Sequence, residues 1–418
     1  MTHPSEPLAG SFPCRFCATP LEHPVVDLGM SPLCESYLTA DLLDARESFY
    51  PLKVWICHRC LLVQINDYVS AEDIFTEYAY YSSFSTSWLQ HASDYVDAMT
   101  DRLGLNEESF VVELASNDGY LLQYFVERHI PCLGIEPSVN VSQAAVAKGV
   151  PTDTSFFGRV KAEQMASAGQ LADLVLGNNV LAQVPDLNDF VAGIPRILKP
   201  SGTVTIEFPH AVRMIEENQF DTIYHEHFCY FSLASAEAIF AHHGMTIFDV
   251  EELWTHGGSL RIYARHTADE SRPLTQRLLD LRQREIDGGY RDVATYAQFE
   301  EQVRETKRAL LETLSDLKRR GKTVVGYGAP GKGNTLLNYC GIRTDFIDFT
   351  VDRNPYKQGR YLPGTHIPIH APERIDEVKP DYVLILPWNF KTEILEQLAY
   401  AREWGAHFIV PIPTASIV

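Results

Sequence analysis

The sequence predicts a mixed α/β fold, with a doubly wound parallel sheet in the middle of the chain and a second, smaller α/β unit near its end. Four short apolar runs between residues 109 and 208 suit buried parallel strands and alternate with segments of helical periodicity. Four similar runs lie between residues 324 and 412, again with helical segments between them. Strands that alternate with helices are typical of a sheet covered on both faces.

Length and charge narrow the classes of function. The 418 residues suffice for two to four domains of roughly 100–200 residues each. Lys and Arg total 35 and Asp and Glu total 55, so the net charge is −20. Phosphate repels such an acidic chain, which argues against nonspecific nucleic-acid and anionic-membrane partners. The chain has no apolar run of about 18 residues and no secretion signal in its first 14 residues, so we expect a cytoplasmic protein.

The eight cysteines therefore need an explanation other than disulfides. Four of them form two CxxC pairs, and each pair can present two thiolates to a metal from one turn. A redox pair or unrelated buried thiols are the alternatives, but a redox CxxC normally opens a helix in a thioredoxin-like setting, which neither pair has. Four thiolates leave no open position on zinc, so the two pairs predict a structural zinc site at Cys14, Cys17, Cys57 and Cys60. The others are expected to be small buried hydrophobic residues: Cys34, Cys132, Cys229 and Cys340.

Small and polar residues follow three successive strands of the first α/β unit, at the sheet edge where such folds bind ligands. A turn at 113–119 lets a ligand approach the backbone, and Glu136 stands about 20 residues beyond it, where ribose hydroxyls are bound. The GxGxxG dinucleotide fingerprint is absent. This pattern suits an adenosine-type ligand without phosphates, such as S-adenosylmethionine (SAM). The candidate cofactor residues are Glu113, Ala115, Asn117, Asp118, Gly119, Glu136, Pro137, Ser138, Asn178 and Asn179.

The pattern changes after this unit. Apolar runs at 245–253 and 259–266 predict strands added at the edge of the sheet. Residues 267–320 lose the strand signal and are rich in Arg, Glu, Leu and Gln, which predicts one or two connecting helices.

The order of the motifs resembles one family. Two CxxC pairs are followed by ELASNDG at 113–119, GIEPS at 134–138, YHEH at 224–227, HGGSLR at 256–261 and GYGAPGKGN at 326–334. This order is similar to that of the zinc-containing, SAM-dependent sugar C-methyltransferases, which include the tetronitrose-pathway enzyme. The resemblance covers nearly the whole chain and implies methylation of carbon 3 of a nucleotide-linked 4-keto deoxysugar. We expect a zinc-binding module at 1–75, a SAM-binding methyltransferase domain at 76–266, a helical connector at 267–320 and a C-terminal α/β nucleotide-sugar-binding domain at 321–418.

The implied chemistry needs a base and a donor to an oxyanion. Removing the proton from carbon 3, which lies α to the ketone, gives an enolate that attacks the methyl group. The resemblance places the YxEH motif on Tyr224, Glu226 and His227 and makes His227 the base. Tyr224 and Tyr78, the family's active-site tyrosine, are expected to donate to the ketone oxygen or position the sugar. Glu226 is expected to orient the histidine or bind the sugar, and if 224–227 is helical, Tyr224 and His227 share a face.

Two alternatives stay open at this motif. His225 and His227 are hard to rank, because a buried histidine is commonly structural. A metal site through the paired histidines of residues 221–227 is less favoured, because the chemistry requires no metal. Two positions depart from the family: Gln183 replaces a histidine and cannot titrate near neutrality, and Ala115 replaces a turn glycine, which is tolerated if its φ is negative.

The resemblance assigns the nucleotide diphosphate to the C-terminal unit. The turn at 326–334 places glycines beside the start of a helix, where N–H groups and the helix dipole attract phosphate. Gly333 follows Lys332 in place of Ser or Thr, so the turn is not an ATPase loop. Trp388 offers a stacking face, and Arg261 is either a phosphate partner or an ordinary surface charge. The candidate substrate residues are Gln183, His225, His256, Arg261, Tyr327, Lys332, Asn334, Asp352, Arg353, Lys357, Trp388 and Asn389.

Two other classes of function compete with a sugar C-methyltransferase. One is SAM-dependent methylation of oxygen or nitrogen in another small molecule, for which a base beside a ketone is superfluous. The other is a noncatalytic zinc-stabilised scaffold, against which the strand-end motifs and YHEH argue. The motifs do not specify the nucleotide base, the substitution and stereochemistry of the sugar, or the oligomeric state.

Overall fold

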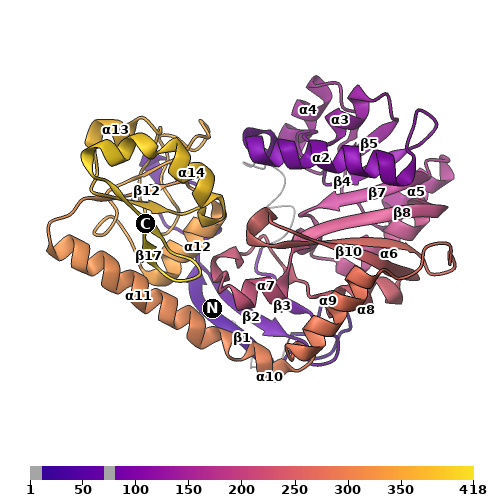
Figure 1. Cartoon of the computed structure of the whole chain (residues 1–418), viewed down its shortest axis with the longest axis horizontal. Coiled ribbons are helices and arrows are strands. Elements are labelled where there is room, and N and C mark those ends of the chain that lie inside the picture. Colours follow the sequence, from indigo (N-terminus) through magenta and orange to yellow (C-terminus); the bar gives the residue numbers. More distant parts are fainter. Residues whose placement is uncertain (1–11, 70–80) are drawn as a thin grey trace, which may run out of the picture.

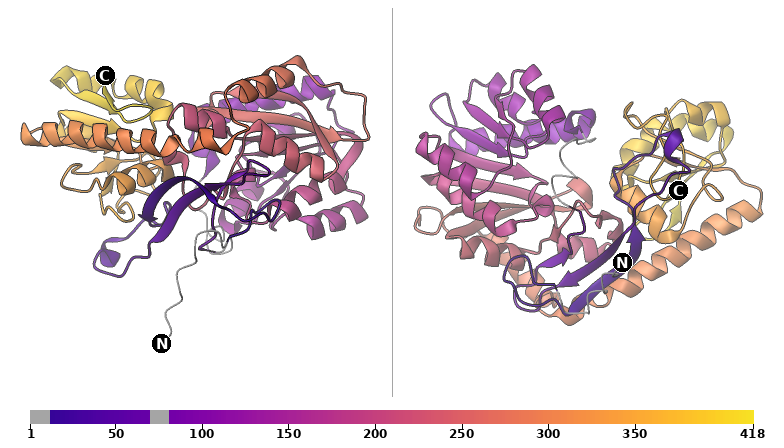
Figure 2. Two further views of the ribbon diagram at one scale, coloured as in Figure 1. Left: turned by 90° about the horizontal axis from the view of Figure 1, so that it is seen from below. Right: turned by 180° about the vertical axis from the view of Figure 1, so that it is seen from behind.

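The structure is a computed structural model that describes residues 12–69 and 81–418. Figure 1 shows a larger lobe built from the middle of the chain and a smaller lobe built from its C-terminal residues. The N-terminal strands and a long helix join the two lobes at their base, as the views in Figure 2 also show. Each lobe contains an α/β sheet, so the predicted fold class is confirmed.

The larger lobe contains a seven-stranded sheet of order β10-β11-β8-β7-β4-β5-β6. Strands β4 to β8 pair in parallel, and β10 and β11 add antiparallel pairs at one edge. The strands are β4 Val111–Leu114, β5 Cys132–Ile135, β6 Thr152–Asp153, β7 Ala172–Asn178, β8 Leu198–Pro209, β10 Met245–Leu253 and β11 Ser259–His266. The last two have the bounds that the sequence predicted for edge strands.

Helices cover both faces of this sheet, because successive strand residues point to opposite sides. On β4, Val111 packs into a core with α2 and α3, whereas Val112 and Leu114 pack into a core with α5, α6 and α8. The helices of this lobe are α2 Thr86–Leu103, α3 Leu122–Glu127, α4 Val139–Ala147, α5 Arg159–Ser167, α6 Leu187–Ile197, α7 Ala211–Glu216 and α8 Leu233–His242. The polar strand ends therefore emerge at one edge of a buried sheet.

A four-stranded antiparallel sheet forms the base of the molecule. It consists of β1 His23–Ser31, β2 Tyr50–Ile56, β3 Val63–Ile65 and β9 Cys229–Tyr230, in that order. The strand β9 comes directly after the YHEH motif, and its residues pair with β3. The N-terminal module and the YHEH turn are therefore parts of one sheet.

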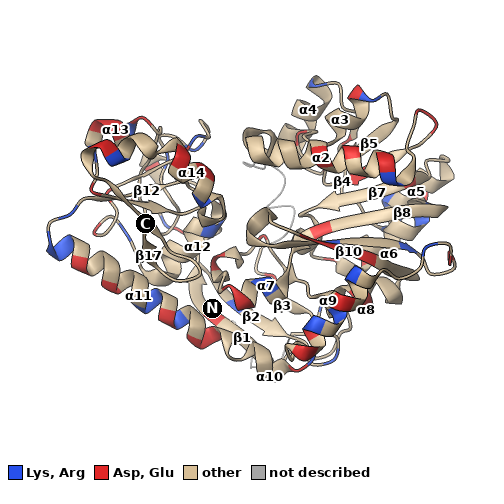
Figure 3. Ribbon diagram, in the orientation of Figure 1, with Lys and Arg blue, Asp and Glu red and all other residues tan. Residues whose placement is uncertain are grey.

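Three helices connect the lobes, where the sequence predicted one or two. They are α9 Gln276–Asp287, α10 Val293–Tyr296 and α11 Phe299–Arg319. Helix α11 packs against β1 and α12 and buries an apolar stripe that includes Phe299, Val303 and Leu310. Its outer face carries alternating charges, which Figure 3 shows along the helix. None of the described helices is long and apolar enough to cross a membrane.

The smaller lobe contains a six-stranded sheet of order β14-β13-β12-β15-β16-β17. All its pairs are parallel except that of β16 with β17. The elements are β12 Val324–Tyr327, α12 Gly331–Cys340, β13 Thr350–Val351, β14 Ile369–His370, α13 Arg374–Val378, β15 Tyr382–Ile385, α14 Lys391–Gln397, β16 His407–Val410 and β17 Ser416–Ile417. The glycine-rich turn thus connects the central strand β12 to α12.

Short 3-10 helices occupy several connections. They are η1 Ala40–Leu42, η2 Ser82–Phe84, η3 Leu181–Gln183, η4 Phe220–Thr222, η5 Thr255–Gly257, η6 Trp388–Phe390 and η7 Ala399–Trp404. Residues of η4, η5 and η6 contact one another, so three connections distant in the chain come together between the lobes.

Glu285 of α9 anchors the connector to the larger lobe. Its buried carboxylate lies 2.9 Å from His210 Nε2 and accepts the N–H groups of Leu233 and Ala234, at 2.7 and 3.0 Å. These two amides belong to the first turn of α8, where N–H groups have no partner within the helix. A carboxylate there satisfies them and favours the helix dipole.

We expect Glu285→Ala to lower the free energy of unfolding by about 3 kcal/mol, because it leaves two helix amides and a histidine buried without their acceptor. The urea midpoint followed by circular dichroism measures this loss. Glu301→Ala, at an exposed position of α11, is the matched control and should leave the midpoint unchanged. Equal midpoints for the two variants would contradict the anchoring role.

Candidate active site and metal centre

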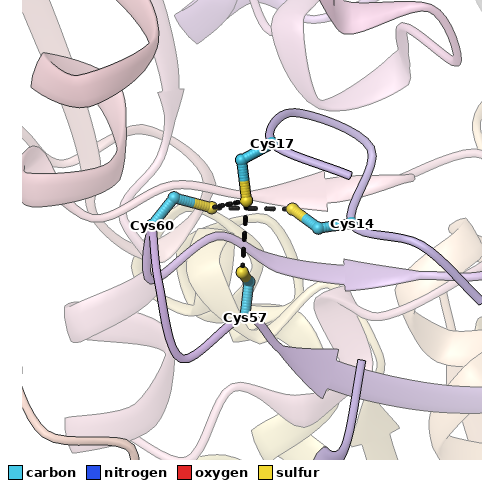
Figure 4. A group of neighbouring side chains, drawn as sticks. All are labelled: Cys14, Cys17, Cys57 and Cys60. Carbon is cyan, nitrogen blue, oxygen red and sulfur yellow. Dashed lines mark hydrogen bonds between the residues drawn. The ribbon is translucent and has the colours of Figure 1, made fainter. Parts of the chain in front are cut away.

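The four predicted zinc ligands lie together in the N-terminal module (Figure 4). The Sγ atoms of Cys14 and Cys60 are 3.5 Å apart, and that of Cys17 lies 3.5 Å from Cys57 and 3.6 Å from Cys60. A tetrahedral zinc with Zn–S bonds of about 2.3 Å holds its sulfurs about 3.8 Å apart, so the cluster fits the metal with a small expansion. Four thiolates complete the coordination and leave no position for a substrate, as in a structural site.

The two CxxC turns have the same backbone geometry. In each turn the residue after the second cysteine has a positive φ, 58° at Ala18 and 59° at Leu61. Its N–H group donates to the carbonyl of the first cysteine, at 2.9 Å in one turn and 2.8 Å in the other. This shared closure points both thiols of each pair toward the same centre.

A cavity of about 310 Å³ lies where the parallel strands of the large sheet end. Seven of the ten predicted cofactor residues line it: Ala115, Asn117, Glu136, Pro137, Ser138, Asn178 and Asn179. Gln183 and His256, predicted to bind substrate, line the same cavity. Ser82 and four aromatic residues that no motif marked also line it: Trp88, Tyr120, Phe156 and Phe157. Aromatic side chains in helices and loops are more often core residues, and a lone serine carries no signal.

Glu136 ties two strand ends together under the cavity. Its carboxylate accepts the N–H groups of Asn117, at 2.9 Å, and Ser138, at 2.8 Å. Asn117 in turn accepts the N–H of Ser82 at 3.0 Å. Burial raises the pKa of Glu136, whereas the bonds from the Ser138 and Asn117 amides oppose that rise. Each carboxylate oxygen has a further lone pair, so the side chain can still accept a ribose hydroxyl.

Alanine can replace the family's turn glycine without strain only if its φ is negative, and the φ of Ala115 is positive. Its φ is 58°, in the left-handed region that L-residues adopt at a cost of about 1–2 kcal/mol. Asn117 and Gly119, at φ of 50° and 75°, share this region, so the turn from 115 to 119 is wound tightly around the cavity wall. At Gly119 a Cβ atom would also lie 2.9 Å from Val150, so this position requires glycine.

Three predicted cofactor residues do not line the cavity. Asp118 is buried and forms an ion pair of 2.9 Å with Lys148, and Gly119 packs against α4. Glu113 is fully buried on β4, and burial raises its pKa well above the ordinary value. These three residues lie within the protein under the turn and do not face the cavity.

The cavity wall contains polar atoms that the described residues leave unsatisfied. Both amide atoms of Asn178 and Oδ1 of Asn179 are buried and have no hydrogen-bond partner within 12–69 and 81–418. Buried polar groups are normally paired, so these atoms indicate a ligand with donors and acceptors of its own. The amino, carboxylate and ribose hydroxyl groups of SAM supply both kinds, and the aromatic walls suit its adenine ring. The donor set therefore fits the predicted cofactor.

The YHEH motif forms a turn and not a helix, yet it brings Tyr224 and His227 together. The rings are 4.1 Å apart, and the Tyr224 hydroxyl lies 2.9 Å from His227 Nε2. His227 Nδ1 lies 3.2 Å from the carbonyl oxygen of Thr222, which can only accept, so Nδ1 carries the proton. Nε2 is then the basic nitrogen and accepts the Tyr224 hydroxyl. Burial, followed by the charges of His256 and Lys332, lowers the pKa of His227 to about 3.

The other two residues of the motif face the N-terminal module. His225 Nε2 lies 3.2 Å from the carbonyl oxygen of Pro51. The buried Glu226 carboxylate accepts the thiol of Cys34 at 3.1 Å, and burial raises the pKa of Glu226 to about 7. Cys34, expected to be merely apolar, is thus a hydrogen-bond donor to the motif, a contact that no spacing in the sequence signals. Tyr78 lies outside the described residues.

The C-terminal lobe contacts the turn that carries His256 through Lys332 and Trp388. Lys332 Nζ donates to the carbonyl oxygen of His256 at 2.8 Å and lies 5.1 Å from the centre of the Trp388 ring. The Trp388 indole donates to Asp221 Oδ2 at 2.7 Å. His256 has a φ of 54° and packs edge-on against Trp88 at 5.2 Å. Burial lowers the pKa of Lys332 to about 8 and that of His256 to about 4, and raises that of Asp221 to about 6.

The Arg261 guanidinium is buried, not on the surface. It forms ion pairs with Glu207 at 2.8 Å and Glu251 at 3.1 Å. Burial alone would raise the pKa of Glu207, but Arg261 and His91 outweigh it and lower that pKa to about 2. Glu207 also accepts the Thr255 hydroxyl at 2.7 Å, so this network holds the turn that carries His256.

The remaining C-terminal candidates contact the protein in different ways. Tyr327 donates to Gln397, Asn334 donates to the Cys34 carbonyl, and Lys357 donates to the Ala329 carbonyl. Asp352 accepts the N–H groups of Ala329 and Asn354, and Arg353 is exposed. Asn389 is half-buried in η6, beside Trp388. The structure therefore gathers these residues around the glycine-rich turn, with Arg353 facing solvent.

Three family models match successive parts of the chain. Residues 14–75 match a model described as "Putative zinc binding domain", residues 88–250 a methyltransferase domain, and residues 254–413 a C-methyltransferase C-terminal domain. Together with the cysteine cluster, these matches define a SAM-dependent methyltransferase with a zinc-binding module.

The chain is also similar along its length to the C-methyltransferase NovU of Streptomyces niveus. The identity is 35% over 407 residues, which are 97% of this chain and 96% of that protein. The chain therefore belongs to the C-methyltransferase family, and the family expected from the sequence is confirmed.

Solved structures resemble it more distantly. A magnesium protoporphyrin IX methyltransferase from Synechocystis PCC 6803 with bound SAM is 14% identical, with a TM-score of 0.35, covering 48% of this chain and 99% of that one. The PH0226 protein of Pyrococcus horikoshii OT3 is also 14% identical, with a TM-score of 0.35, covering 47% and 97%.

We expect the purified chain to contain stoichiometric zinc by atomic absorption and the double variant Cys57→Ser, Cys60→Ser to lose it, because two thiolates cannot hold the metal tightly. The loss should lower the thermal midpoint as well, since these cysteines flank β2 and β3 of the base sheet. Cys132→Ser, at a buried cysteine far from the cluster, is the control and should keep its zinc. Wild-type chain without stoichiometric metal would contradict the site.

Proposed function

We propose that the chain transfers a methyl group from SAM to carbon 3 of a nucleotide-linked 4-keto deoxysugar, by way of an enolate. Its membership of the C-methyltransferase family supports carbon as the accepting atom. The observation that carries the proposal is the contact of the half-buried Tyr224 with the buried His227, in which a hydroxyl and a neutral imidazole meet at 2.9 Å. An enolate mechanism requires a proton acceptor and a hydrogen-bond donor side by side, which the methylation of an alcohol or amine does not.

His227 acts as the base in this mechanism. Its Nδ1–H is fixed on the Thr222 carbonyl, so Nε2 is free to take the proton from carbon 3 once the Tyr224 hydroxyl turns from Nε2 to the ketone oxygen. The electron pair of the broken C–H bond passes to the ketone, giving the enolate, whose carbon 3 then bonds to the methyl carbon. SAM, when bound, supplies that methyl group on a sulfonium leaving group. Asn117, Glu136, Asn178 and the neighbouring strand ends hold and orient it.

The position of Gln183 supports a binding role there and not proton transfer. Its side chain lines the same cavity as Asn178 and Asn179. An amide can hydrogen-bond a sugar hydroxyl but cannot accept a proton near neutrality. The proton therefore passes to the YHEH turn.

The C-terminal lobe holds the nucleotide diphosphate in this proposal. Arg353 is exposed beside the glycine-rich turn, and a guanidinium suits bidentate contact with phosphate. Asn389 and the Tyr327 ring offer polar and stacking contacts to the base. Lys357, Asn334 and Asp352 act on this site by fixing the turn, since each contacts its backbone or the segment packed on it.

We expect His227→Asn to abolish methyl transfer and solvent deuterium exchange at carbon 3, while the calorimetric affinity for SAM stays close to that of the wild type. His225→Asn is the matched control within the motif, because its imidazole contacts the Pro51 carbonyl. That variant should keep exchanging deuterium. Near-normal exchange in His227→Asn would remove His227 from the role of base, and loss only in His225→Asn would transfer the role to that residue.

The substrate class is tested with a panel of TDP-, GDP- and CDP-linked 4-keto sugars. We expect one of them to gain one methylene in mass, and NMR to place the new methyl on carbon 3. Exchange of the carbon 3 proton with solvent should accompany the reaction, because only the enolate route exchanges it. A product methylated on oxygen or nitrogen, without exchange, would refute the proposal.

A further inference from the structure

We propose that Lys332 is a catalytic residue that binds the substrate's ketone oxygen and stabilises the negative charge of the enolate. This inference rests on the proposed function and reassigns Lys332 from the diphosphate to the reacting centre.

The Lys332 ammonium is buried with most of its donor capacity unused. The residue is 8% exposed, and among the described residues its ammonium donates one hydrogen bond, to the His256 carbonyl. No carboxylate of the described ranges lies within 4.0 Å of it, and the charge of Asp221 only partly offsets the lowering of its pKa by burial. An ammonium group has three N–H donors, and burying one without a close ionic partner is costly. A ligand oxygen would give the remaining donors an acceptor.

Its neighbours are those of the proposed reaction. The carbonyl that it binds belongs to His256, whose side chain lines the donor cavity. The Trp388 indole, whose ring centre lies 5.1 Å from the ammonium, donates to Asp221. The next residue, Thr222, binds His227 Nδ1 through its carbonyl, so the ammonium also lies near the turn that carries the base. Asp221 Oδ1 and His256 Nε2 are buried nearby and have no hydrogen-bond partner among the described residues. A substrate oxygen at Lys332 would therefore lie beside the turn that lines the donor cavity and near the turn that carries the base.

The Trp388 ring and the helix α12 complete this electrostatic environment. The ring face lies 5.1 Å from the ammonium, and its indole N–H is held by Asp221. Lys332 belongs to the first turn of the ten-residue helix α12, whose dipole adds positive potential at that end. In a site that excludes water, a preorganised positive charge stabilises a developing oxyanion far more than the same charge does in solution.

The other side of the glycine-rich turn is closed by protein, which argues against an open diphosphate site at Lys332. A Cβ atom on Gly331 would lie 2.7 Å from Cys34 Sγ and 3.4 Å from Glu35 Oε1. Asn334 donates to the Cys34 carbonyl at 2.5 Å, and Tyr37 donates to the Ala329 carbonyl at 2.6 Å. Segment 34–37 therefore packs where phosphate would approach the helix end, and Lys332 points away from solvent.

A purely structural lysine is the competing interpretation, in which Lys332 only tethers the His256 turn. The two roles differ in what the loss of charge changes. A tether acts on the shape of the donor cavity, so its loss weakens SAM binding. A catalytic cation acts on the enolate, so its loss slows proton exchange at carbon 3 with the bound SAM unaffected.

The test compares Lys332→Met with Lys307→Met. Lys307 makes the same kinds of contact, since its ammonium donates to the Tyr339 carbonyl at 2.5 Å and lies 4.6 Å from the Tyr339 ring, but it is half-buried and belongs to α11. We expect Lys332→Met to lower deuterium exchange and methyl transfer at least about a hundredfold, as the loss of one oxyanion donor does. SAM affinity and the affinity for TDP, GDP or CDP should stay within about twofold. Lys307→Met should match the wild type in all four measurements.

Three outcomes would overturn the inference. Wild-type exchange in Lys332→Met excludes a catalytic charge, loss of SAM affinity assigns a tether, and loss of nucleoside diphosphate affinity restores the diphosphate role. Failure of the proposed function is distinguishable from all three, because the wild-type chain itself would then methylate its substrate without exchanging the carbon 3 proton.

Discussion

The pairing of β3 with β9 is the constraint on which the arrangement of the site depends. Two residue pairs, Val63 with Tyr230 and Gln64 with Cys229, place the end of the YHEH turn in the sheet of the N-terminal module. The amide of Ile65 extends this ladder to the carbonyl of Phe228. The turn is therefore fixed from one side by the module that carries the cysteines and from the other by α12 and η4. Its histidine and tyrosine meet without a helix, because this sheet and these helices hold them.

Buried charged and polar groups have different numbers of partners in the framework of the fold and at the proposed reacting centre. Arg261 has two carboxylate partners and Glu285 has three donors, so these buried charges are paired and position the turns that they hold. By contrast, among the described residues Lys332 donates one hydrogen bond, to a neutral carbonyl, and the Asn178 amide has no partner. Unsatisfied groups are costly to bury. Those at the cavity wall suit a bound methyl donor, and Lys332 is the group that we assign to the acceptor.

Much of this could be predicted from the sequence, because short-range patterns specify it. Alternating apolar runs gave the strand positions, including both edge strands, and CxxC spacing gave the cysteine cluster. What depends on packing between distant segments could not be read in this way. The positive φ of Ala115, the Cys34–Glu226 contact and the burial of Arg261 each arise from neighbours far away in the chain. Even the Tyr224–His227 contact occurs for a reason other than the helical spacing that suggested it.

The shared base sheet also imposes an order on biosynthesis. All four cysteines precede the larger lobe in the chain, so the two CxxC turns can close around a metal before that lobe has been synthesised. The fourth strand of the same sheet follows only after the whole parallel sheet up to β8 has been made. Until then the edge of β3 is an unpaired strand edge, a template for pairing with other chains. Metal capture can thus precede completion of the module, and the edge of β3 stays open to pairing with other chains while most of the larger lobe is synthesised.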